Sequence, residues 1–136
     1  MALTDVRVLD ALRFNQLVGP YDRFGWNHPG PALFYLLSAV ARVLGSGGRA
    51  DFVGAALING LSALGVVWVV RRRAGAWPAL WAASCMGLLE IVLSTPWNPD
   101  VGASVASPWD PYVVIFPLVL FGTLAAVGAT GSWPSI

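Results

Sequence analysis

The sequence contains no lysine, one cysteine and one histidine, and only 11% of its 136 residues are charged. An ordinary soluble domain carries about a quarter charged residues. The eight basic residues are all arginines, the seven acids bring the net charge to +1, and no basic stripe emerges that could neutralise a row of phosphates. Binding to nucleic acid is therefore not predicted.

The sequence also offers few residues that could form disulfides or bind a metal ion. Cys85 has no partner in the sequence, which excludes a disulfide framework and a thiolate metal site, and His28 alone cannot form a metal site. No cofactor is indicated, and because no ligand cluster is visible, the involvement of a divalent metal stays open. The first 30 residues contain three Asp and three Arg without a continuous apolar stretch, so no signal peptide is predicted.

Apolar side chains are abundant: hydrophobic residues make up 57% of the chain and the mean hydropathy is +0.67. This composition predicts an all-α integral membrane protein. The charge-free stretch 52–70 is predicted to be a transmembrane helix, and 76–93 and 112–129 are predicted to be two more. Arg71-Arg72-Arg73 follows the first stretch at once, and arginine clusters beside a span stay in the cytoplasm. The segments 1–50 and 94–111 are therefore expected outside the cell membrane.

The outer segment 1–50 is predicted to hold two amphipathic juxtamembrane helices. Leu3, Val6, Leu9 and Leu12 recur at helical spacing within residues 3–14. Residues 32–44 are apolar apart from Ser38 and Arg42, but they are too few for an ordinary span and suit a helix at the membrane surface. The chain thus divides into an outer unit, 1–50, and a transmembrane unit, 51–136, with an outer loop at 94–111.

Between these two helices, the run Gly19-Pro-Tyr-Asp-Arg-Phe-Gly-Trp-Asn-His-Pro-Gly-Pro31 combines aromatic side chains, both charge signs and the only histidine. Proline fixes φ and glycine permits unusual backbone angles, so this run can hold its polar side chains in one irregular shape. Loops of this kind more often carry function than merely connect elements. The second outer loop contains a short repeat, Pro96-Trp-Asn-Pro-Asp-Val101 and Pro108-Trp-Asp-Pro-Tyr-Val113.

The run at 19–31, together with the following Phe34-Tyr35-Leu36-Leu37 and the Trp-Asn-Pro element, resembles multi-pass membrane glycosyltransferases of the GT-C class. The similarity is to an uncharacterised branch related to the protein mannosyltransferases and aminoarabinose transferases. It covers nearly the whole chain but only the front portion of such a protein. The family's first transmembrane helix has no counterpart, and its first outer acidic residue would fall at or before Met1. The chain is therefore expected to be a truncated gene product, the product of a mis-assigned start, or a fragment of a longer protein.

The resemblance implies sugar transfer from a polyprenyl-phosphate donor on the outer face. Such a reaction needs a base for the acceptor and cations for the departing phosphate. Asp5 is the candidate catalytic base, with helix capping or surface solvation as the alternative. The candidate substrate-binding residues are Tyr21, Asp22, Arg23, Trp26, Asn27, His28, Trp109 and Asp110.

For several of these residues a structural role competes with the functional one. Arg23 can grip a phosphate through its planar fork, but it can equally pair with Asp22 or reach lipid headgroups. His28 can add a hydrogen bond to the phosphate or stabilise the local turn. Trp26 and Trp109 can stack on a sugar or anchor the chain at the membrane interface.

Two functions from different classes follow. The first is a partial GT-C-like glycosyltransferase, and because the family's first helix and acid have no counterpart, the activity of this truncated chain on its own stays open. The second is a small non-enzymatic multi-pass membrane protein that binds a partner or lipid through its outer loops. Membrane lipid is an expected partner in both cases, and association with other membrane helices is an open alternative to a solitary chain.

Overall fold

The computed structural model describes residues 2–21, 24–27, 30–45, 47–93, 106–108 and 110–130, the side chains of 2, 110 and 111 excepted. In this part of the chain every regular element is helical, as the composition predicts. The helices are, in order, α1 (Ala2–Leu12), α2 (Ala32–Leu44), α3 (Gly48–Ala74), α4 (Ala76–Leu93), α5 (Asp110–Val113) and α6 (Ile115–Ala129).

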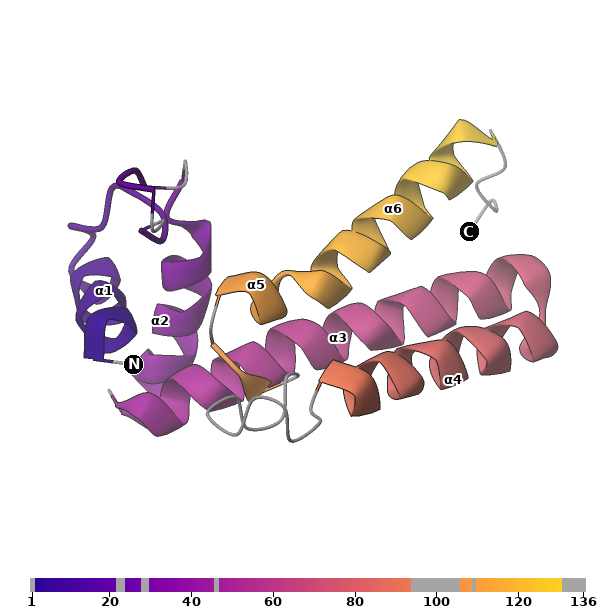
Figure 1. Cartoon of the computed structure of the whole chain (residues 1–136), viewed down its shortest axis with the longest axis horizontal. Coiled ribbons are helices and arrows are strands. Elements are labelled where there is room, and N and C mark those ends of the chain that lie inside the picture. Colours follow the sequence, from indigo (N-terminus) through magenta and orange to yellow (C-terminus); the bar gives the residue numbers. More distant parts are fainter. Residues whose placement is uncertain are drawn as a thin grey trace.

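The long helix α3 is the element on which the others assemble (Figure 1). α4 runs back along it and α6 packs on it as well, while α1 and α2 lie crosswise at its N-terminal end. The reversal between α3 and α4 occurs at Gly75, which has φ +94° and donates its N–H to the carbonyl oxygen of Arg71 at 3.1 Å. A left-handed residue after the last helical turn is the usual way to end a helix sharply, and glycine adopts it without steric cost.

Two of these helices are long and apolar enough to cross a membrane by length and composition, namely α3 with 27 residues and α4 with 18. The predicted span 52–70 lies inside α3, and α4 has the predicted bounds 76–93. The predicted 112–129 helix is interrupted at Val114, which separates α5 from α6. Pro117 explains the interruption, because its ring has no N–H for the carbonyl of Val113 and clashes with it. α6 keeps 15 residues, about 22 Å.

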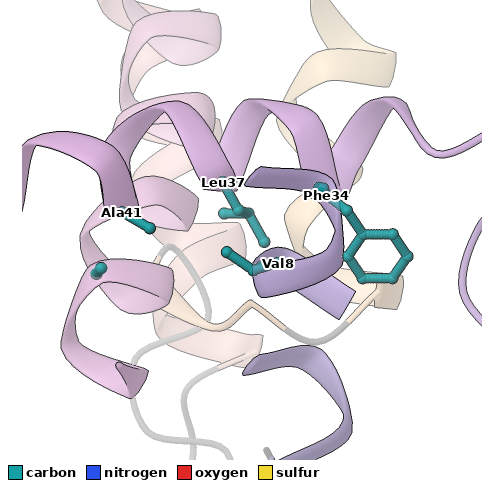
Figure 2. Close-up of a cluster of buried hydrophobic side chains, with 6 residues drawn as sticks. Val8, Phe34, Leu37 and Ala41 are labelled. Carbon is teal, nitrogen blue, oxygen red and sulfur yellow. The ribbon is translucent and has the colours of Figure 1, made fainter. Parts of the chain in front are cut away.

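A small core holds α1 and α2 together at the start of α3. Its buried members are Val8 and Ala11 of α1, Phe34, Leu37 and Ala41 of α2, and Ala50 of α3 (Figure 2). The stripe of Leu3, Val6 and Leu9, which the spacing marks as the apolar side of α1, faces outward instead and stays exposed. α1 therefore carries two apolar faces, of which the protein itself covers only one.

The outer surface of the long helices is also apolar. Ala79 is the only residue of α4 that is buried, although most side chains of that helix are apolar. The large exposed side chains of α3, α4 and α6 include Leu57, Leu61, Leu64, Trp68, Trp77, Leu80, Trp81, Leu88, Ile91, Val92, Leu118 and Phe121. Contiguous apolar patches of this extent mark surfaces that meet lipid or another protein.

The contact between α2 and α3 depends on a glycine. A Cβ added at Gly54 would lie 2.7 Å from Cδ2 of Leu37, whose side chain is fully buried. Gly54→Ala is therefore expected to cost about 1–3 kcal/mol, the usual range for overpacking. Thermal unfolding of the purified protein in detergent measures this loss.

Gly60→Ala is the matched control, because nothing lies within 4 Å of a Cβ at Gly60 in the same helix. This variant is expected to be as stable as the parent or slightly more so, since alanine has the higher helix propensity. Equal unfolding temperatures for the two variants would contradict the close packing of α2 on α3.

Candidate functional site

Two carboxyl groups meet where α1 touches α3. Asp5 lies in the first turn of α1 and Asp51 in the first turn of α3, and their side chains share a hydrogen bond. Asp51 is 3% exposed, whereas Asp5 is half-buried. Asp51 precedes the charge-free stretch that begins at Phe52. The predicted catalytic residue thus has a buried acidic partner that the sequence did not reveal.

Burial raises the pKa of Asp51 from 3.8 to about 7, and the hydrogen bond and negative charge of Asp5 add to the rise. Two carboxylates in contact cannot both remain ionised without strong repulsion, so such a pair retains a proton. The raised pKa of Asp51 means that near neutral pH one proton lies in the hydrogen bond between the two carboxyl groups. The pair is therefore a proton-holding site at the junction of two helices.

Polar contacts fix the other end of α1 relative to α2. The hydroxyl of Tyr35 donates to the carbonyl oxygen of Gln16 at 3.0 Å, and the Arg42 guanidinium donates to the carbonyl oxygen of Leu12 at 3.3 Å. The ring of Phe14 lies 6.0 Å from that of Tyr35, and Phe14 has the left-handed φ of 59° where the chain leaves α1. These bonds hold α1 and α2 as a hairpin and so determine the position of Asp5.

The described part of the 19–31 run folds back on itself. Tyr21 and Asn27 form an isolated antiparallel bridge, with Gly25 at φ +91° in the turn between them. The side chains of Tyr21, Trp26 and Asn27 are exposed, and that of Phe24 is 73% exposed. The run therefore presents aromatic and amide groups at the surface, as a binding loop requires.

The structure does not bring this loop to Asp5. Figure 1 shows the described part of the loop at the end of the α1–α2 hairpin that lies away from α3. Asp5 belongs to the first turn of α1 and bonds to Asp51 of α3, at the opposite end of the hairpin. Asp22, Arg23, His28 and Trp109 fall outside the described residues. Asp110 begins α5, which contacts α3, and its side chain is not among those described.

A hollow, separate from the carboxyl pair, lies between α3, α4 and α6. Its volume is about 290 Å³, and Gly60, Ala63, Met86, Gly87 and Phe116 are among the residues that line it. Asn59 and Glu90 add polar groups to a wall that is otherwise apolar. This hollow suits a hydrocarbon chain better than polar chemistry, so the carboxyl pair is the stronger candidate site.

Asp51 is the residue that the sequence reading missed. An acid immediately before a long apolar stretch was visible, but only the fold shows that α1 returns an acid to the same place. In the described part of the chain, no group of three or more His, Cys, Asp or Glu side chains could hold a metal ion. Comparison with known proteins adds no assignment, since no protein-family model, curated protein or solved structure matches the chain.

The raised pKa of Asp51 makes stability depend on pH. The folded state holds this proton more tightly than the unfolded state, so the stabilising effect is complete below pH 3.8 and is lost as the pH rises to about 7. Asp51→Asn is expected to remove this loss and to raise the unfolding temperature at pH 8 by about 5 °C or more. Unfolding curves of both proteins at pH 5 and pH 8 measure the effect.

Asp10→Asn is the control for this experiment, because Asp10 is a half-buried acid on the same helix. It should retain the pH dependence of the parent protein. A parent protein that is equally stable at pH 5 and pH 8 would contradict the buried carboxyl pair.

Proposed function

We propose that the chain is the front portion of a GT-C-like membrane glycosyltransferase that transfers sugar from a polyprenyl-phosphate donor on the outer face of the membrane. The single observation that carries the proposal is the crosswise position of the α1–α2 hairpin at one end of α3, with Arg71, Arg72 and Arg73 at the other end. If α3 crosses the bilayer, α1 and α2 lie along its surface.

The charges of α3 support this orientation. Its three arginines occupy the last turn, and Arg72 stacks on Trp68 with 5.7 Å between the guanidinium carbon and the ring centroid. Arginine clusters stay cytoplasmic, and a tryptophan beside them fits the interfacial belt. The hairpin, Asp5 and the 19–31 loop then face outward, where the exposed stripe Leu3, Val6 and Leu9 of α1 can enter the headgroup region.

In the proposed reaction Asp5 accepts the proton of the acceptor hydroxyl as its oxygen attacks the anomeric carbon. The bond from that carbon to the phosphate oxygen breaks, and polyprenyl phosphate leaves with the bonding electrons. Arg23 and His28 stabilise the departing phosphate, while Tyr21 and Trp26 offer ring faces to sugar. Because one oxygen joins the anomeric carbon to the phosphate, this reaction requires the 19–31 loop and Asp5 to come together when the donor binds.

The alternative, a small membrane protein that binds lipid or a partner without catalysis, is favoured by a different observation. The exposed apolar side chains of α4 and α6 leave most of the surface of both helices available for contact with other helices or lipid. Binding of this kind does not require the carboxyl pair.

Donor binding and turnover separate the two functions. With the chain in lipid nanodiscs and a labelled polyprenyl-phosphate sugar, Asp5→Asn is expected to slow the release of free sugar to water at least 100-fold, because a positioned base contributes about 10²–10⁴-fold. Donor binding should be unchanged in this variant. Arg23→Ala is expected to weaken donor binding about tenfold through the loss of charged hydrogen bonds.

Asp10→Asn serves as the control and should match the parent in both assays. If the parent chain releases no sugar but binds the donor, and Arg23→Ala does not weaken that binding, the glycosyltransferase proposal fails. If the parent binds no more donor than empty nanodiscs, it also fails and the non-enzymatic alternative stands.

The orientation has its own test in intact cells. Asn15 and Arg72 are both exposed, so cysteines at these positions, in a Cys85→Ser background, can react with a membrane-impermeant thiol reagent. The Asn15→Cys variant is expected to be labelled in intact cells, and the Arg72→Cys variant only after lysis. Labelling of the Arg72→Cys variant alone in intact cells would reverse the orientation.

A further inference from the structure

We propose that Asp5 and Asp51 form a proton-dependent latch, in which one shared proton holds the first turn of α1 against the first turn of α3 and its loss releases α1. The latch concerns the docking of a helix, so it stands or falls independently of the proposed sugar transfer.

The position of the pair is the first support for the latch. Asp51 is almost fully buried, yet the side chain it contacts bears the same charge when ionised. Docking therefore places two acids together, and with a proton between them the repulsion becomes a hydrogen bond.

Among the described side chains, no other charged group near this junction replaces the shared proton, because Asp5 alone acts on the charge of Asp51. On α1, Arg7 and Asp10 are half-buried, and on α2 Arg42 donates to the Leu12 carbonyl. Arg49, on α3 itself, is exposed. Glu90 of α4 lines the hollow together with Asn59 of α3. Asn59 lies more than two helical turns beyond Asp51 in α3. α6 contributes no charged residue, and the side chain of Asp110 in α5 is not among those described.

The rest of the α1 contact is modest enough for this pair to matter. α1 contributes two fully buried apolar side chains, Val8 and Ala11, to the core, and both are small. The hydrogen bonds from Tyr35 and Arg42 hold the opposite end of α1, near Leu12 and Gln16. Loss of the shared proton would thus free the N-terminal half of α1 while its C-terminal end stays attached to α2.

Thiol accessibility at Val8 tests the latch. Val8 is 2% exposed when α1 is docked, whereas Leu9 on the same helix is 40% exposed. In the full chain with Cys85→Ser, the labelling rate of a Val8→Cys variant is divided by that of a Leu9→Cys variant, which cancels the pH dependence of thiol chemistry. Between pH 6 and pH 8.5 this ratio is expected to rise about tenfold, because burial and Asp5 raise the pKa of Asp51 from its ordinary 3.8 to about 7, a value within this pH range.

Substitutions at Asp5 and Asp51 test whether this pair causes the rise in the labelling ratio. Asp51→Asn should make the ratio independent of pH, with Asp51→Ser as a second neutral replacement if the first does not fold. Asp5→Asn should retain a smaller rise, because burial still acts on Asp51 but the repulsion is gone. Asp10→Asn should retain the full rise. A ratio that does not change with pH in the parent, or a full rise in a folded Asp51 variant or in Asp5→Asn, would overturn the latch.

Discussion

The contact of Leu37 with Gly54 is the constraint on which the rest of the arrangement depends. Because Gly54 has no side chain, α2 can lie close against the start of α3 with Leu37 fully buried between them. α1 is fixed mainly to α2, through Val8, Ala11 and the hydrogen bonds from Tyr35 and Arg42. The closeness of α2 to α3 therefore also sets the distance between Asp5 and Asp51.

The same arrangement explains why the long helices are so little buried. In the described part of the chain, α3 contacts every other helix, and its buried residues include small or polar ones such as Ala55, Asn59 and Ser62. Gly65 shows how close these approaches are, since a Cβ there would lie 3.1 Å from Leu120 of α6. The large apolar side chains consequently point outward. This distribution, with small residues inside and large ones outside, is typical of helices that associate in lipid.

Sequence reasoning anticipated the helices better than their contacts. The apolar runs bounded by proline and glycine give the observed bounds of α2 and α4. The interruption at Val114 was also readable in principle, because Pro117 marks it. The buried face of α1 was not readable, since spacing favours Leu3, Val6 and Leu9 while packing selects Val8 and Ala11. Which apolar face is buried depends on the partner helix, and a single sequence does not specify that partner.

The contact between Asp5 and Asp51 was not readable from the sequence either. The protonation of Asp51 in this pair has an energetic cost that bears on its role. An ionised acid in the first turn of a helix gains from the macrodipole, and the three arginines in the last turn of α3 gain in the same way. Asp51 forgoes this gain, because its buried carboxyl retains a proton beside Asp5. At neutral pH an asparagine would satisfy the same hydrogen bond without the cost of ionisation. A residue that departs from the local optimum without a compensating structural gain is expected where function, rather than folding, sets the requirement.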